Sequence, residues 1–177
     1  KGPGGALIGF PVISFSQTTM SFVQDGESLL DAMKFTDVTA TAGLDFGESF
    51  MPGTGCLAVG DLDGDSDQDI FFSGRKASGD PVRYLLFNDL GMFRDIASSA
   101  GITPAGKDMH ASVADYDNDG HLDILIIRED GLQIFKNTSE GKFTNSTGTA
   151  FSNASGITGN SAMFFDADHE GDLDLII

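Results

Sequence analysis

The sequence predicts an all-β protein built from repeated four-stranded antiparallel units. Three acidic loops of one spacing recur at residues 61–69, 115–123 and 166–174, so that their first aspartates lie 54 and 51 residues apart. Short apolar runs rich in β-branched and aromatic residues flank each loop, and such runs favour strands and are too short for helices. Repetition at a period of about 50 residues is typical of architectures that use one supersecondary unit per repeat.

The strands of each unit follow in order around the loops. The first strands, before the loops, are at 56–59, 111–114 and 162–165, and the second strands, after them, are at 70–72, 124–127 and 175–177. Third strands are predicted at 83–87 and 132–135, and fourth strands, after a glycine-containing turn, at 91–93 and 141–143. Each complete unit therefore has four strands.

Fourth strands carry a second signature. Residues 35–39 lead to Ala42-Gly43-Leu44, residues 93–97 lead to Ala100-Gly101-Ile102, and a weaker copy occupies residues 143–147. We interpret these residues as packing and turn positions without a catalytic role.

The chemistry of the loops follows from the positions of their carboxylates. Acidic side chains occupy positions 1, 3, 5 and 9 of every loop, a spacing with which one tight turn can surround a hard cation. Calcium fits best, because it accepts about 6–8 oxygen ligands in a flexible shell, whereas magnesium keeps its waters and zinc prefers nitrogen or sulfur. The candidate ligands are Asp61, Asp63, Asp65 and Asp69; Asp115, Asp117, Asp119 and Asp123; and Asp166, Asp168, Glu170 and Asp174.

Two further loop positions have expected roles. Position 7, held by Asp67, His121 and Asp172, usually contributes its backbone carbonyl in loops of this kind, so its identity can vary. Position 6 needs a sharp turn and is glycine at Gly120 and Gly171, but serine at Ser66, which makes the first loop depart from the pattern.

The same opening also begins an EF-hand, so the residues after each loop decide between the two interpretations. An EF-hand has a bidentate glutamate at position 12 and continues as a helix. Here position 12 is Phe72, Ile126 and Ile177, inside apolar strand-like runs. Acidic turns without metal are the simpler alternative, but three copies in one register between strands argue against them.

Charge excludes one class of partner. The formal net charge is −17, from 27 acidic and 10 basic residues, and the three loops hold 14 of the 27 acids. Three calcium ions would add +6 and leave about −11, and no basic stripe is present to neutralise phosphates, so nucleic acid is not an expected partner. The longest apolar stretch, residues 6–15, is interrupted by Gly9 and Pro11, and no membrane span is expected.

Three N-glycosylation sequons begin at Asn137, Asn145 and Asn153, in a stretch rich in Ser, Thr, Asn and Gly. Their clustering suggests an exposed, sugar-bearing surface and therefore a secreted, extracellular protein. Extracellular calcium would also fill loops of modest affinity, with Kd of about 10⁻⁴–10⁻³ M.

The acidic loops and the fourth-strand signature together resemble the calcium-binding FG-GAP or VCBS repeats of integrin α-chain-like and cartilage-acidic-protein-like propellers. The resemblance covers residues 35–177, although literal FG-GAP tetrads are absent and Glu170 replaces the usual Asp or Asn. It implies that each repeat is a four-stranded β-propeller blade with a structural Ca²⁺ between its first and second strands. Carried over to this chain, it gives three calcium sites with the ligands named above.

The resemblance also divides the chain. Residues 1–34 become an N-terminal extension with possible donor strands, residues 35–44 the end of a preceding blade, residues 54–102 and 108–157 two blades, and residues 160–177 a half blade. A closed propeller needs at least about four blades, so a partial propeller or an open array is expected. Either the chain is a piece of a longer propeller, or the N-terminal strands of one copy complete the half blade of the next, which would propagate as a fibre.

The leading functional hypothesis is a non-enzymatic calcium-binding scaffold that contacts proteins, glycans or copies of itself. A fragment of a larger adhesion or receptor propeller is the alternative, followed by a carbohydrate-active enzyme, since paired acids can hydrolyse glycosides. We expect no catalysis, because one repeated loop explains the acids, because His110, His121 and His169 are scattered, and because no HExxH motif or Gly-rich phosphate loop is present.

Overall fold

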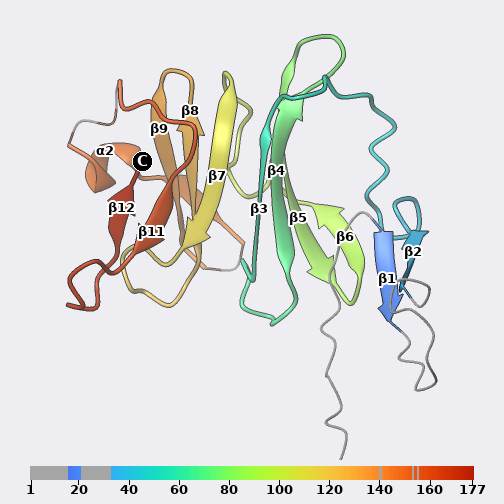
Figure 1. Cartoon of the computed structure of the whole chain (residues 1–177), viewed down its shortest axis with the longest axis horizontal. Helices are drawn as coiled ribbons and strands as arrows, with labels where there is room; N and C mark the ends of the chain where they lie inside the picture. Colours follow the sequence, from blue (N-terminus) through green and yellow to red (C-terminus); the bar gives the residue numbers. More distant parts are fainter. Residues whose placement is uncertain (1–15, 21–32, 140, 153, 155) are drawn as a thin grey trace, which may run out of the picture. The chain divides into compact units, whose positions relative to one another are not determined.

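The computed structural model describes residues 16–20, 33–139, 141–152, 154 and 156–177 (Figure 1). They belong to two compact units, Lys1–Phe46 and Gly47–Ile177. Nearly all regular structure is antiparallel β, which confirms the predicted fold class. The exception is a four-residue helix, α2 (Thr147–Ala150), which lies in a segment where the sequence predicts no helix.

In the first unit, β1 (Ser16–Met20) pairs with β2 (Met33–Asp37) in an antiparallel ladder. β2 overlaps the fourth strand predicted at residues 35–39. A compact turn follows, in which the N–H of Ala42 donates to Val38 O at 2.8 Å and that of Leu44 donates to Thr39 O at 2.9 Å. The remaining possible donor strands in residues 1–34 lie outside the described residues.

The second unit contains two four-stranded sheets and one two-stranded sheet. The first sheet consists of β3 (Cys56–Gly60), β4 (Asp69–Arg75), β5 (Pro81–Asp89) and β6 (Met92–Asp95). The second consists of β7 (Asp108–Ala114), β8 (Asp123–Arg128), β9 (Gly131–Asn137) and β10 (Phe143–Asn145). The third pairs β11 (Met163–Phe165) with β12 (Asp174–Ile176). In both larger sheets, strands consecutive in sequence are neighbours, so each sheet is an antiparallel meander.

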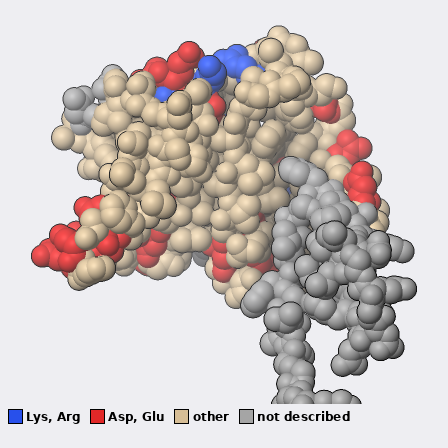
Figure 2. All heavy atoms as spheres, viewed as in Figure 1, with Lys and Arg blue, Asp and Glu red and all other residues tan. Residues whose placement is uncertain are grey.

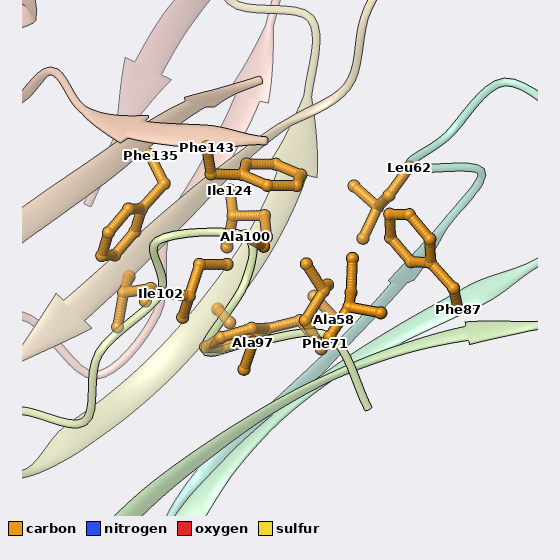
Figure 3. Close-up of a cluster of buried hydrophobic side chains, with 14 residues drawn as sticks. Ala58, Leu62, Phe71, Phe87, Ala97, Ala100, Ile102, Ile124, Phe135 and Phe143 are labelled. Atoms are coloured by element: carbon orange, nitrogen blue, oxygen red, sulfur yellow. The ribbon is translucent and has the colours of Figure 1, made fainter. Parts of the chain in front are cut away.

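The two larger sheets pack over a shared apolar core (Figure 3). Phe71 and Leu85 from the first sheet belong to the same cluster as Ile124 and Phe135 from the second, and none of the four is more than 2% exposed. The turn after β6 also enters this core through Ala97, Ala100 and Ile102. Burial of these side chains is the main force that holds the sheets together.

The turn after β6 repeats the one in the first unit. The N–H of Ala100 donates to Ile96 O at 2.8 Å and that of Ile102 donates to Ala97 O at 2.9 Å, as in the Ala42-Gly43-Leu44 turn. Gly101 has a φ of 84°, a left-handed conformation that glycine adopts without the steric cost of a side chain. The residues of this signature therefore form a turn and pack in the core, in line with the predicted role.

Both faces of β8 are buried. Ile124 and Ile126 belong to the first core, whereas Leu125 and Ile127 belong to a second core that also contacts Phe164 and Leu175 of the two-stranded sheet. Because the strand is covered on both sides, its apolar residues run consecutively instead of alternating with polar ones.

A buried ion pair also joins the two larger sheets. The Arg83 guanidinium on β5 donates from Nε and Nη2 to the two carboxylate oxygens of Asp108 on β7, both at 2.8 Å. It also donates to Thr103 O at 2.9 Å and lies 5.6 Å from the ring centre of Phe135. The side chains of the pair are only 1% and 5% exposed.

The first strands of the two larger sheets, β3 and β7, lie against each other, as the innermost strands of neighbouring propeller blades do. Among the described residues the sheets do not close into a ring (Figure 1). This arrangement is the partial propeller or open array that the sequence predicts.

None of the described helices has the length and the apolar character needed to cross a membrane.

Candidate metal centre

The three acidic loops lie along one edge of the second unit. Each joins the first two strands of its sheet, and their turns point to the lower side of Figure 1. Figure 2 shows acidic side chains gathered along the same side. The second and third loops also touch, because Asn118 Nδ2 donates to Gly171 O at 3.2 Å.

The loops share one backbone hydrogen bond. In every loop the aspartate at position 1 accepts the N–H of position 6. The distances are 3.0 Å for Asp61 and Ser66, 2.8 Å for Asp115 and Gly120, and 3.1 Å for Asp166 and Gly171. The departure at Ser66 therefore keeps this hydrogen bond, although Asp61 Oδ1 accepts the N–H of Gly64 at 2.7 Å whereas Asp115 Oδ1 accepts that of Asp119 at 2.9 Å.

Two positions in each loop have left-handed backbone. The φ angle lies between 77° and 93° at position 6 and between 57° and 82° at position 4, which is held by Gly64, Asn118 and His169. The sequence indicates the need for glycine at position 6 but not the same need at position 4. In the first loop the glycine stands at position 4 and the strained non-glycine residue at position 6.

The aspartate at position 9 anchors each loop to its sheet. Asp69 accepts the N–H of Leu62 through Oδ2 and that of Asn88, at the end of β5, through Oδ1, both at 2.8 Å. Asp123 does the same with Tyr116 at 3.1 Å and with Asn137, at the end of β9, at 2.7 Å. In the third loop Asp174 accepts the N–H of Ala167 at 3.0 Å.

These anchors are buried acids. Asp69 is fully buried and Asp123 is 1% exposed, and burial raises the pKa of each carboxyl to about 6. The neighbouring aspartates of the loops raise the pKa further, while the backbone N–H donors act in the opposite direction. A cation held beside them would favour their ionised forms.

The structure brings together three carboxylates in each of the first two loops. One oxygen each from Asp61, Asp63 and Asp65 lie within 4.8 Å of one another, and so do oxygens from Asp115, Asp117 and Asp123. Asp69 is outside the first group and Asp119 is outside the second. Among the described residues, the carboxylates of the third loop form no such group.

The sequence model of the FG-GAP-like repeat family matches residues 61–126 and, in a second copy, residues 115–177. The two matches together span about two thirds of the chain. The chain belongs to the FG-GAP-like repeat family. Both FG-GAP-like matches begin at the first aspartate of an acidic loop, Asp61 and Asp115. None of the curated proteins compared with the chain matches it significantly.

The loop residues of this FG-GAP-like chain fit a hard cation. The first two groups supply carboxylate oxygens only, which is the donor type that calcium and magnesium prefer. In the third loop, Asp166 Oδ1 is buried without a hydrogen-bond partner, which leaves a carboxylate oxygen in need of a donor or an ion. The described structure can therefore hold metal ions at two groups, and it keeps the backbone conformation of the loop at the third.

A lysine enters the second FG-GAP-like loop. Lys136 Nζ, from β9, contacts Asp117 Oδ2 and lies 2.9 Å from Asp119 Oδ2. These ion pairs lower the pKa of Asp119, and they raise that of Lys136. At the corresponding place in the first sheet, one residue before Asn88 on β5, stands Phe87, which is buried in the core. The sequence gives no signal for this contact, because the lysine belongs to the third strand and not to the loop.

The side chains at position 7 differ in what they contact. Asp67 Oδ2 accepts the N–H of Leu90 at 3.0 Å and so supports the turn between β5 and β6. His121 and Asp172 are exposed. Backbone coordination at this position stays a prediction for all three loops.

Two asparagines that sequence reasoning did not assign to the loops are part of their support. Asn88 donates from Nδ2 to Gln68 O at 3.2 Å, and Asn137 donates from Nδ2 to Leu122 O at 3.2 Å and to Leu62 O at 2.8 Å. The signal that could have found them is their shared place at the end of the third strand.

The geometry of Asn137 argues against it as a sugar acceptor. The residue is 2% exposed, and the nitrogen that would carry the glycan makes the two hydrogen bonds to Leu62 and Leu122. A glycan there would require both bonds to break. In this structure Asn137 has a structural role, because its side chain makes these two hydrogen bonds at the end of β9.

The other two sequons stand differently. Asn145 is exposed. Its Oδ1 accepts two hydrogen bonds from Thr147, one from the backbone N–H at 3.1 Å and one from the side-chain hydroxyl at 2.7 Å. Asp37 and Asp95 make the same backbone turn with the residues two positions later, so Asn145 also has a structural role in its repeat. Asn153 lies outside the described residues.

Proposed function

We propose that this FG-GAP-like chain is a non-enzymatic, calcium-stabilised repeat scaffold of the extracellular space. The observation that carries the proposal is the repetition of one loop conformation in three hairpins, two of which gather three carboxylate oxygens within 4.8 Å. The proposed ligands are the carboxylates at positions 1, 3, 5 and 9 of each loop, with the backbone of position 7 as a further ligand. Bound calcium would supply the positive charge that offsets the crowded acids.

The first loop takes part in the packing between the two larger sheets, so its conformation affects that packing. Leu62, at position 2 of the first loop, is 1% exposed in the core between the two larger sheets. Its N–H donates to Asp69, and its carbonyl accepts from Asn137 Nδ2 of the second sheet. Holding the first loop in this conformation therefore also holds the contact between the sheets.

The structure offers little support for catalysis at these loops. The acids recur at the same positions of three hairpin loops, and the Asp69 and Asp123 carboxylates already accept hydrogen bonds from backbone N–H groups. Cys56, a half-buried thiol 3.2 Å from Ser73 Oγ, has its pKa raised to about 11 by burial, so it stays protonated at neutral pH. FG-GAP-like repeats generally mediate protein interactions, which supports a protein partner.

The two-stranded sheet favours a partner at that end of the unit. Met163, Phe165, Ile176 and Ile177 are between 39% and 59% exposed there. Exposed apolar strands of this kind are suited to cover by further strands, from a longer chain or from a second copy, and head-to-tail assembly into a fibre is one form of this contact. Light scattering and electron microscopy with and without calcium test assembly, and monodisperse particles under both conditions would exclude it.

The central experiment measures unfolding in EDTA, in calcium and in magnesium. Calcium at about 100 times its Kd should stabilise the protein by about 2–3 kcal/mol per site, and magnesium should do less. Asp63→Asn should remove part of this gain, whereas Asp130→Asn, in the β8–β9 turn at the opposite edge, should keep it. Equal stability in EDTA and calcium would overturn the proposal, and so would glycoside turnover that depends on the loop acids.

A further inference from the structure

We propose that Lys136 is a built-in competitor for the cation of the second loop, so that this loop is a weaker, switchable site than the first. The inference rests on the proposed function, because it concerns the affinity of one of the calcium sites. Two observations support it. The Lys136 ammonium contacts carboxylates of the second loop, and the first loop has a phenylalanine at the corresponding position of its sheet.

The ammonium group of Lys136 already occupies ligands. It contacts Asp117 Oδ2 and lies 2.9 Å from Asp119 Oδ2, so it takes oxygens at positions 3 and 5 of the loop. The Lys136 side chain is 30% exposed, and those of Asp117 and Asp119 are 28% and 31% exposed. Water therefore screens the ion pairs, and the ammonium is able to leave. The ammonium thus neutralises part of the negative charge of the loop in a reversible way.

Lys136 contacts one carboxylate inside the metal-ligand group, Asp117, and one outside it, Asp119. In the first loop, positions 1, 3 and 5 gather as Asp61, Asp63 and Asp65. In the second, Asp115 and Asp117 gather with Asp123 of position 9, and Asp119 of position 5 stands apart beside the lysine. The full oxygen set at the second loop therefore requires Lys136 to release both Asp117 and Asp119.

The first loop has no such competitor among the described residues. Its counterpart of Lys136 is Phe87, which is 9% exposed and packed in the core between the sheets. Both loops keep the hydrogen bond from the N–H of position 6 to the aspartate at position 1, and the residue of the third strand beside them is charged in the second sheet only. We therefore expect the first loop to fill at lower calcium concentration than the second.

Replacing the lysine tests the affinity. EDTA-stripped protein is titrated with calcium chloride in a calorimeter, as wild type, as Lys136→Gln and as Lys142→Gln. Lys142 is also exposed and lies in the turn between β9 and β10, where its backbone makes the hydrogen bonds, so its replacement removes the same charge without touching the loop. Lys136→Gln should tighten one class of sites by about tenfold, and Lys142→Gln should change affinity far less.

A second measurement uses the unaltered chain. Amine acylation followed by mass spectrometry reports how accessible each lysine is. Saturating calcium should raise the labelling rate of Lys136 several-fold, because its ammonium leaves Asp117 and Asp119, while Lys142 should react equally with and without calcium.

The outcomes separate the two proposals. If calcium binds but Lys136→Gln and Lys142→Gln behave alike, or if Lys136 labelling does not respond to calcium, the competitor role is wrong and the scaffold proposal stands. If the second loop takes up no calcium in wild type at any concentration, Lys136 is a permanent substitute for the ion, and the inference is overturned. If calcium binds to no loop in any variant, the proposed function itself fails.

Discussion

The serine at position 6 of the first loop adopts a backbone conformation that costs energy. Ser66 has a φ of 77°, where the other two loops place Gly120 and Gly171 at 89° and 93°. A residue with a Cβ in this region is disfavoured by about 1–2 kcal/mol relative to its right-handed state, whereas glycine is not. The strain is tolerated because Asp61 accepts the N–H of Ser66 at 3.0 Å.

We expect Ser66→Gly to stabilise the protein by about 0.5–1 kcal/mol, because relief of the strain exceeds the extra entropy that glycine brings to the unfolded chain. Urea unfolding in calcium buffer measures the change. The matched variant Gly120→Ser introduces the same strain into the second loop and should destabilise by a similar amount. Destabilisation by Ser66→Gly would show that the serine side chain contributes more than its backbone costs.

The buried aspartates at position 9 predict an unusual pH dependence for the metal-free protein. Asp69 and Asp123 have their pKa raised to about 6 in the folded state, against an ordinary value of 3.8, mainly by burial. Their protonated forms therefore stabilise the fold fully below the ordinary pKa, and that stabilisation is lost as the pH rises through about 6. Glu48 and Asp119 have lowered pKa values, so their contributions change below that window.

In EDTA, the free energy of unfolding should fall between about pH 4 and pH 6, by on the order of 1–3 kcal/mol for each of the two aspartates. In saturating calcium the fall should be smaller, because an adjacent cation favours the ionised carboxylates and lowers their pKa. Urea unfolding at half-unit pH intervals under both conditions measures this difference. Identical pH profiles with and without calcium would mean that no cation binds next to these carboxylates.

At the scale of elements, the sequence predicts what is repeated and local. The spacing of the acids and the apolar runs on either side predict the hairpins β3–β4, β7–β8 and β11–β12, since both signals lie within about 20 residues of chain. The Ala42-Gly43-Leu44 and Ala100-Gly101-Ile102 turns are found in the same way, because each closes on itself through hydrogen bonds over four or five residues.

The contacts that the sequence does not predict are made between elements. Arg83 and Asp108 are 25 residues apart, and Asn137 is 75 residues from the Leu62 carbonyl that it contacts. Lys136 reaches Asp117 only because of the register in which β9 pairs with β8. Nothing in the local pattern around these residues specifies a partner, since the register and the packing of two sheets decide it. For the same reason Asn137 reads as a sequon in sequence and is a buried support in the structure.

The Arg83 and Asp108 pair should be important for the contact between the two larger sheets. Removing one partner of a buried ion pair leaves the other charge unpaired, which costs about 3–5 kcal/mol. We therefore expect Arg83→Ala to lower the free energy of unfolding by about that amount, as measured with urea. Arg128→Ala is the matched control, because Arg128 is 20% exposed and its Nε lies 4.0 Å from the same carboxylate.

The double replacement of Arg83 by Met and Asp108 by Leu separates charge from packing. If the cost of Arg83→Ala comes from the unpaired aspartate, the apolar pair should recover much of the lost stability. A double variant that is as unstable as Arg83→Ala would show instead that the hydrogen bond to Thr103 O and the contact with Phe135 hold the sheets together.

At the scale of the whole second unit, stability should be distributed unevenly. Within the sheet β7–β10, the strand β8 is buried on both faces, and Ile124, Leu125, Ile126 and Ile127 are at most 1% exposed. The sheet β11–β12 has two short strands and exposes Met163, Phe165 and Ile176. Segments with few buried apolar contacts open at lower free energy than the core, and amide hydrogen exchange reports the difference.

We expect the amides of β8 to exchange slowest and those of β11 and β12 to exchange fastest among the strands of the second unit. Hydrogen exchange with mass spectrometry, at low protein concentration and in calcium, measures both. Ile126→Ala should lower global stability by about 2–5 kcal/mol, whereas Ile176→Ser should change it by less than about 0.5 kcal/mol. If a second copy covers the two-stranded sheet, protection of β11 and β12 should rise with protein concentration while that of β8 stays constant. Slow, concentration-independent exchange in β11 and β12 would contradict the unequal distribution of stability.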